Sequence, residues 1–264
     1  TMKKFLSIIA LMFAVVACKP TANIDIKING IAEDSIALYK LNINRLTLVD
    51  SLKTNKDGEC NYKVALTDEN PAFYYLYRGE TKLAGMILLP EDKVEITADT
   101  LGKYEIAGSI ESTNLKYIDD ALANSTSAML KVLNEQPADA NQQLSKIYIN
   151  HKRAMIKHAL TNPKSITAAT VLFQKFNDNL PVFGEQTDII SFKQIYDSLM
   201  VVYPTSEYLT SLKNEIDARE NAIAMLKKVN EASSLSYPDI TGIDINGKEV
   251  SLSSFDGSVI ILSF

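Results

Sequence analysis

Hydrophobic and polar residues alternate along the first part of the chain, and this pattern predicts β-strands. In the segment IDIKING, Ile24, Ile26 and Ile28 alternate with polar residues, as in a strand with one buried face. Short runs of strand-forming residues follow, separated by turn residues: DSIALYKL, LTLVDSLKT, ECNYKV, AFYYLYRG, LAGMILLP, KVEITAD and KYEIAG. About eight short strands at this spacing predict an antiparallel β-sandwich or barrel, which we place at residues 24–108.

One turn in this region has a specific signal. Asp57 and Gly58 stand between two runs of strand-forming residues, and Asp-Gly is a frequent pair in hairpin turns. The alternation after the turn places Cys60, Tyr62 and Val64 on one face. We expect that face to be buried, which makes Cys60 an inert core thiol.

The hydrophobic period becomes helical after residue 108. Asn162 and Pro163 have the pattern of a helix cap followed by proline at the first helical position. We expect helices near residues 113–134, 139–161, 163–176, 188–201 and 206–231. The last of these contains one apolar stripe, formed by Leu209, Leu212, Ile216, Ile223 and Leu226. Residues 109–232 are therefore predicted to form a helical domain, and the fold class is α+β.

The third section, residues 233–264, reads as strands and turns. Asn246-Gly247 lies between GIDI and KEVSL and indicates a hairpin. SLSSFDGS predicts a short turn or a single helical turn. The apolar run from Val259 to Leu262 is typical of a strand buried on both faces in a parallel sheet. Such a strand either pairs with an earlier segment or belongs to a longer protein.

The amino-terminal residues have the pattern of an export signal. Lys3 and Lys4 precede an apolar stretch from Phe5 to Ala17, which is shorter than the roughly 20 residues of a membrane-spanning helix. We therefore expect a secretory signal at residues 2–17.

The residues VVAC at the end of this signal resemble the lipobox of bacterial lipoproteins. That resemblance implies that Cys18 is lipidated after the signal is cut before it, with a tether at residues 18–23. More than one acyl chain then gives stable attachment to a membrane. An ordinary signal peptide with a chance cysteine is the alternative.

Charge and cysteine content exclude several function classes. The sequence has 27 basic and 32 acidic residues, and removal of the signal leaves it about seven units negative. This charge argues against nucleic acid as a partner. With Cys18 lipidated, Cys60 is the remaining thiol, so an internal disulfide is excluded.

The segment YPDITGIDINGKEVSLSSFDGSVIILSF resembles the start of a thioredoxin-like domain of the peroxiredoxin (AhpC/TSA) and thiol-disulfide oxidoreductase type. The family pattern has a proline, a glycine after a hairpin, an L-S-x-F-x-G turn and an apolar strand ending in an aromatic residue. The matching residues are Pro238, Gly247, Leu252, Ser253, Phe255, Gly257 and Phe264. Ile240 and Ser258 depart from it, where Phe and Lys are usual. In the family a W-C-x-x-C motif follows a few residues later.

The order of the segments is similar to that of Gram-negative lipoproteins with a β-domain of unknown function ahead of a thioredoxin-like domain. Asp50, Ser51, Asp57 and Gly58 fit the pattern of that β-domain, although Cys60 replaces its first aromatic residue. The resemblance implies that residues 233–264 begin an incomplete thioredoxin-like domain that is truncated before the CxxC.

The function implied by this resemblance is the N-terminal part of a membrane-anchored thiol-disulfide oxidoreductase. It implies a location on the periplasmic face of the outer membrane and periplasmic disulfide-containing proteins as partners. The chain itself would be inactive, because exchange needs a thiolate at a helix N-terminus and a resolving thiol. A non-catalytic lipoprotein binding or scaffold module and a peroxiredoxin-like peroxidase remain the alternatives.

The other candidate side chains have structural explanations from sequence alone. His151 and His158 lie among lysine and arginine residues on one predicted helix, so we expect solvated or capping histidines and no metal site. We expect exposed helix faces at Asp119-Asp120 and at Asp217 with Glu220. The aromatic residues Phe73, Tyr74, Tyr75 and Tyr77 are expected in a sheet core, with tyrosines at its outer rim. A ligand groove lined by these residues is the alternative. No catalytic residue, cofactor or metal ligand is predicted.

Overall fold

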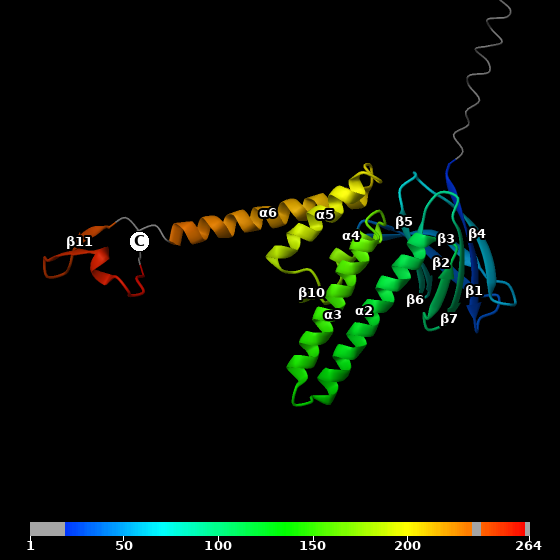
Figure 1. The fold of residues 1–264 in the computed structure, drawn as a ribbon, viewed down its shortest axis with the longest axis horizontal. Helices are drawn as coiled ribbons and strands as arrows, with labels where there is room; N and C mark the ends of the chain where they lie inside the picture. The colour runs from blue at the N-terminus through cyan, green and yellow to red at the C-terminus, as the bar shows by residue number, and fades with distance from the viewer. Residues whose placement is uncertain (1–18, 234–238, 262–264) are drawn as a thin grey trace, which may run out of the picture. The chain divides into compact units, whose positions relative to one another are not determined.

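The computed structural model describes residues 19–233 and 239–261, which group into two units, Thr1–Asp217 and Ala218–Phe264. Cys18 and the signal at residues 2–17 lie outside the described residues. The described structure is mixed α+β, as the sequence predicts (Figure 1).

The first unit begins with eight strands in two four-stranded sheets. One sheet has the order β4-β1-β7-β8 and the other β3-β2-β5-β6. The strands are β1 (Thr21–Asn29), β2 (Ser35–Asn42), β3 (Arg45–Lys53), β4 (Glu59–Ala65), β5 (Ala72–Arg78), β6 (Thr81–Leu88), β7 (Lys93–Asp99) and β8 (Tyr104–Ala107). β1 begins at Thr21, so the predicted tether at residues 18–23 is shorter than expected.

A shared hydrophobic core joins the two sheets into a sandwich. Ile24, Ile26 and Ile28 of β1 are at most 2% exposed, and they belong to the same buried cluster as Ile36 and Leu38 of β2. The alternation in IDIKING therefore reports burial correctly. Cys60 and Tyr62 pack against this core and remain partly accessible, while Val64 is fully buried.

The expectation of a purely antiparallel sheet is wrong for one pair of strands. β1 pairs antiparallel with β4 but parallel with β7, in register from Asn23 opposite Lys93 to Asn29 opposite Asp99. Parallel pairing needs a long connection between the two strands. Here that connection is the other five strands, β2 to β6, so local sequence patterns contain no signal for it.

The Asp57-Gly58 turn forms as predicted. Gly58 has φ +75°, and a Cβ placed there would lie 2.3 Å from the backbone oxygen of Ile28. Glycine is therefore required at this position both for the backbone conformation and for the close approach of β1.

The second sheet is covered on both faces. Tyr74 and Leu76 face the sandwich core, while Phe73 and Tyr75 pack against the helices. The expectation of outward tyrosines at a rim is therefore wrong for Tyr75, because the helices cover that face. Burial raises the pKa of Tyr74 to about 12 and that of Tyr75 still further.

The helical part packs on this sheet through its first helix, α2 (Ile110–Glu135). The hydroxyl of Ser112 donates to the backbone oxygen of Ile87 in β6 (2.7 Å) and accepts from its backbone nitrogen (3.1 Å). A helix side chain thus satisfies the backbone of an edge strand, which would otherwise be open to pairing.

The other elements of this part follow in chain order. They are α3 (Ala140–Thr161), α4 (Thr167–Leu172), β9 (Lys175–Asn177), β10 (Leu180–Pro181), η1 (Gln186–Asp188), α5 (Ile189–Met200) and α6 (Glu207–Ser233). Four of the five predicted helices agree with the structure to within a few residues.

The predicted helix at residues 163–176 is the exception. Asn162 caps the carboxyl end of α3, with its side-chain nitrogen donating to the backbone oxygen of His158 (2.9 Å). A turn follows, α4 begins only at Thr167, and the chain after it forms the short β9–β10 pair. The amide that was expected to open one helix instead closes the preceding one.

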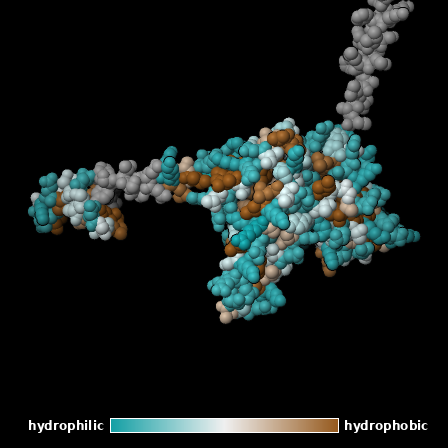
Figure 2. Space-filling view, in the orientation of Figure 1, coloured by the Kyte–Doolittle hydropathy of each residue, from teal (hydrophilic) through white to brown (hydrophobic). Residues whose placement is uncertain are grey.

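The apolar stripe of α6 divides into two halves. Leu209, Leu212 and Ile216 are buried in the helical core, at 0–3% exposure. Beyond them Ile223 is half-buried and Leu226 is 48% exposed. The space-filling view shows hydrophobic surface uncovered along α6 (Figure 2). The helical spacing is therefore correct, but burial of the whole stripe is not found within the described residues.

The second unit contains a small hairpin. β11 (Thr241–Ile243) pairs antiparallel with β12 (Glu249–Ser251), and η2 (Leu252–Phe255) follows as a single turn. Gly247 has φ +80° in the predicted turn. Residues 259–261 form no strand, and Val259 and Ile261 are 95% and 89% exposed. The predicted buried strand is therefore not found here, because the described part of this unit has no neighbouring strand to pair with it. Residues 262–264 lie outside the described residues.

Candidate functional site

A groove of about 560 Å³ lies between α2, α3 and the β9–β10 hairpin. Its lining is mainly apolar, and its volume falls within the usual range of ligand pockets, roughly 300–1,000 Å³. The lining residues are Thr126, Met129, Leu130 and Leu133 of α2, Leu144, Ser145, Tyr148 and Ile149 of α3, and Phe176, Asn177, Leu180 and Glu185. This apolar groove is the candidate binding site.

The sequence builds the groove through helical spacing. On α2 the lining positions recur at intervals of three and four residues, so they form one face of the helix. Leu130 and Leu133 on this face are 55% and 53% exposed. Ile149 of α3, at 45% exposure, lines the same groove, so the two helices together provide apolar surface for an additional molecule.

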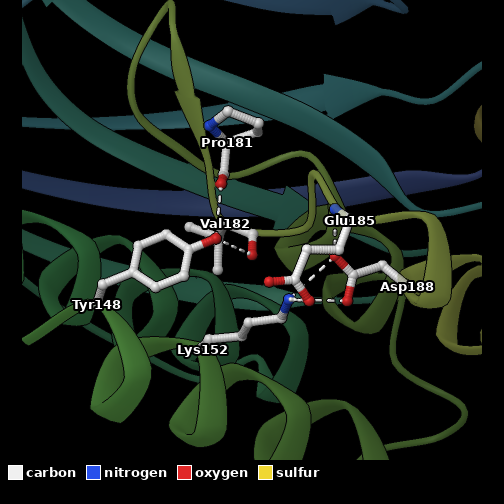
Figure 3. Close-up of polar contacts among 6 residues, drawn as sticks. All are labelled: Tyr148, Lys152, Pro181, Val182, Glu185 and Asp188. Atoms are coloured by element: carbon white, nitrogen blue, oxygen red, sulfur yellow. Dashed lines mark hydrogen bonds and ion pairs between the residues drawn. The ribbon is translucent and has the colours of Figure 1, made fainter. Parts of the chain in front are cut away.

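A set of polar contacts fixes one end of the groove (Figure 3). The hydroxyl of Tyr148 lies 3.0 Å from the backbone oxygens of both Pro181 and Val182. Burial raises the pKa of this hydroxyl, so it stays protonated as a donor. The contact holds the chain after β10 against α3.

Lys152, one turn further along α3, binds the next segment of the chain. Its Nζ lies 3.2 Å from Oε2 of Glu185 and 2.8 Å from Oδ1 of Asp188. Asp188 and Glu185 also form a reciprocal capping box at the start of η1. Burial alone would lower the pKa of Lys152, but the hydrogen bonds to Asp188 and Glu185 together raise it. Lys152 is therefore charged, and it orders the segment that borders the groove.

His151 packs against Phe176 of the groove wall and is buried, which corrects the expectation of a solvated side chain. Its Nε2 is 3.0 Å from Oε1 of Gln174, and its Nδ1 is 3.1 Å from the hydroxyl of Ser125. Burial lowers its pKa. A neutral imidazole with both ring nitrogens partnered has a structural role here.

His158 is buried in a second polar network, so the same expectation is wrong for it too. Its Nε2 lies 2.9 Å from the hydroxyl of Thr167, which lies 2.6 Å from that of Ser165. The Ser165 hydroxyl donates to Glu111 (2.7 Å). These four residues are at most 7% exposed, so no substrate can reach the serine. Burial lowers the pKa of His158 and raises that of Glu111.

The carboxylates expected on exposed helix faces differ from one another. Asp120 is exposed and pairs with Lys116, and Asp217 pairs with Lys213 four residues earlier. Asp119 is only half exposed, and it reaches Lys82 of the sheet (3.3 Å). This partial burial corrects the expectation of an exposed Asp119 side chain, and it raises the pKa of the carboxyl group.

In the part of the chain that the structure describes, no group of three or more His, Cys, Asp or Glu lies within reach of one metal ion. None of the described helices is long and apolar enough to cross a bilayer. Cys60, the described free thiol, packs against the sandwich core, and burial raises its pKa.

Sequence reasoning missed the residues that form the groove and its polar end. Tyr148 and Lys152 are spaced four apart on α3, but their partners at residues 181–188 lie in a segment without regular periodicity. The available signal was Glu185 and Asp188 three residues apart ahead of an apolar run, which is the spacing of a capping box.

Comparisons with known proteins give little guidance. No protein family matches the chain, and no curated protein matches it. Among solved structures, (S)-allantoin synthase is similar over 34% of this chain and 44% of that protein, with 15% identity and a TM-score of 0.22. The match spans less than half of that protein, and a similarity this low supports no conclusion about function.

Proposed function

We propose that this chain is the N-terminal part of a lipid-anchored, periplasm-facing thiol-disulfide oxidoreductase. The observation that carries the proposal is the second unit. Its hairpin and single turn, residues 239–257, have the order that a thioredoxin-like domain shows before its first central strand. Gly247 lies in the turn of the hairpin, and Leu252, Ser253 and Phe255 form η2.

Local contacts support this assignment of the turn. Ser253 donates its backbone N–H to Oδ1 of Asp239 (2.9 Å) and its hydroxyl to Oδ2 (2.7 Å). Asp239 follows the motif proline Pro238 in the sequence, so the hydrogen bonds between Ser253 and Asp239 link the two ends of the motif. This contact gives the serine of the L-S-x-F pattern a physical role.

The chemistry requires two thiols that the proposal assigns to the chain beyond Phe264. The attacking cysteine has to be a thiolate, which a helix N-terminus favours by lowering its pKa, with a resolving thiol nearby. Cys60 has the opposite environment, since burial raises its pKa. In this proposal the first unit provides a rigid platform and a binding surface for periplasmic disulfide-containing partners.

The decisive experiment is to sequence the coding DNA past codon 264. A tryptophan and a Cys-x-x-Cys motif within about ten codons would support the oxidoreductase. A single cysteine without the second would favour a peroxiredoxin-like peroxidase. A stop codon would refute both. The 264-residue chain alone is expected to reduce insulin disulfides no faster than a Cys60→Ser control.

The proposed anchor has its own test. In a Gram-negative host, a palmitate analogue should label the protein, and Cys18→Ser should abolish the labelling while Cys60→Ser leaves it intact. Label on the Cys18→Ser variant would contradict lipidation at Cys18, and fractionation with the inner membrane would contradict the outer-membrane location.

The apolar groove favours a second candidate, a non-catalytic lipoprotein binding module. Its exposed leucines and ordered polar end are features of a binding site, and the described residues suffice to form it. Ligand binding by a chain whose gene ends at codon 264 would favour this candidate over the first.

A further inference from the structure

Helix α3 differs in charge from the rest of the chain. Its sequence contains Lys146, Lys152, Arg153 and Lys157 and no aspartate or glutamate, whereas the whole chain has a net charge of −5. Lys152 is neutralised by Glu185 and Asp188. Lys146 and Arg153 are exposed, and neither forms an ion pair with any described residue. Two cationic groups are therefore available to an anionic ligand.

These two residues line a shallow depression of about 610 Å³ along α3. We call it the basic shelf, and its other polar residues are Asn141, Gln142, Ser145 and Asn150. Ser145 and Ile149 line both the basic shelf and the apolar groove. The two surfaces therefore meet along one ridge of α3, with apolar side chains on one side and cations on the other.

The apolar groove is short. Its α2 positions run from Thr126 to Leu133, which is two helical turns or about 10 Å. The β9–β10 hairpin contributes Phe176 and Leu180 to its wall. These dimensions suit one aliphatic chain better than a long amphipathic helix, which would need a groove open along several turns.

We propose that the groove and shelf together bind an anionic amphiphile with a single aliphatic chain, of the fatty-acid class. The tail lies among Leu130, Leu133 and Ile149, and the carboxylate contacts Lys146 and Arg153. The acidic Glu185 lies at the polar end near Lys152, so the anionic head belongs on the shelf. This inference rests on the groove and the basic shelf and is independent of the redox proposal.

The test measures binding of dodecanoate, below its micelle concentration, to the purified chain by titration calorimetry. We expect one site, with affinity falling about fourfold for each methylene removed in a decanoate and octanoate series. Dodecyltrimethylammonium, which has the same tail and a cationic head, should bind at least tenfold more weakly. Equal binding of the two amphiphiles would overturn the proposal.

Matched variants separate the site from general effects. Leu130→Glu should weaken dodecanoate binding at least tenfold, whereas Leu160→Glu should not, although both leucines are 55% exposed. Lys146→Glu combined with Arg153→Glu should weaken it about tenfold, and Lys157→Glu, outside both surfaces, should have little effect. Folding of each variant is checked by circular dichroism.

Three further results would refute the assignment. One is the absence of dodecanoate binding to a folded chain. Another is equal loss of binding in the site and control variants. The third is a Leu130-dependent dimer in sedimentation that buries the groove and excludes dodecanoate, which would identify a second copy of the chain as the occupant.

Discussion

Replacement of Lys152 by methionine tests the polar end of the groove most directly. Lys152 and Asp188 are largely buried, with side-chain exposures of 14% and 8%. Methionine keeps the length of the aliphatic stem but removes the charge. The carboxylate of Asp188 then retains the backbone N–H of Glu185 (2.9 Å) as its partner from the capping box. The variant therefore leaves a buried anion that is only partly compensated.

The expected cost follows from this arrangement. Removing one partner of a buried ion pair costs roughly 3–5 kcal/mol. Glu185 is 68% exposed, so its contact contributes little, and the remaining backbone hydrogen bond keeps the total toward the lower end. We expect about 3 kcal/mol of lost unfolding free energy. For a domain of this size, that corresponds to a fall in Tm of roughly 6–12 °C.

The assay is urea unfolding followed by circular dichroism, with Lys157→Met as the matched control. Lys157 is exposed on the same helix, so its replacement should change stability by less than about 0.5 kcal/mol. The double variant with Asp188→Asn should be less destabilised than the sum of the single variants, by roughly 1–3 kcal/mol. Equal stability of Lys152→Met and Lys157→Met would refute the ion pair as an ordering contact.

Four further predictions follow from other contacts. Gly58→Ala should lower the unfolding free energy by at least about 2 kcal/mol, because it combines a left-handed backbone with a Cβ 2.3 Å from the backbone oxygen of Ile28. Gly79→Ala, at φ +56° with open space around it, should lower it by only about 1 kcal/mol in the same assay, and equal losses would contradict the clash. Burial lowers the pKa of His151 and His158, so the unfolded chain takes up protons first as the pH falls through about 6.5, and stability should fall below that pH. The raised pKa of Glu111 has the opposite effect on stability. His158→Gln should lower the number of protons taken up on unfolding by up to one, and so reduce the dependence of the unfolding free energy on pH; an unchanged dependence would contradict this account. The Cys60 thiol should react with a disulfide reagent at pH 8 much more slowly in the folded chain than in urea, and equal rates would show that it is accessible. Amide exchange should be faster at residues 239–261 than in β1 or β5, because a hairpin of two three-residue strands is marginal by itself, and uniform protection would contradict this expectation.

The parts of the fold that depend on local patterns were predictable. Ile24, Ile26 and Ile28 show their buried face by alternation, and Leu209, Leu212 and Ile216 show theirs by helical spacing. The hairpin at Asn246-Gly247 follows from turn chemistry. In each case a few adjacent residues contain the information.

Features that depend on distant partners were not predictable. β1 meets β7 because the chain returns after five intervening strands, and either direction of pairing would show the same alternation. His151 and His158 look like surface residues beside lysines, but Gln174 and Thr167 arrive from other segments to bury and partner them. The groove has the same origin, since the partners of Tyr148 and Lys152 come from a connecting segment.

The position of β1 in its sheet determines how the sandwich responds to mechanical force. β1 starts two residues after the first described residue, and it lies between β4 and β7 with seven register pairs on each side. A force applied along the axis of β1 from its amino-terminal end therefore acts in shear on the β1–β4 and β1–β7 pairings. The hydrogen bonds of both pairings resist this force together. An edge strand peeled from one neighbour would yield one bond at a time. Under tension this end of the domain should be the slowest part to unfold, which would suit a strand that follows the lipid anchor proposed at Cys18.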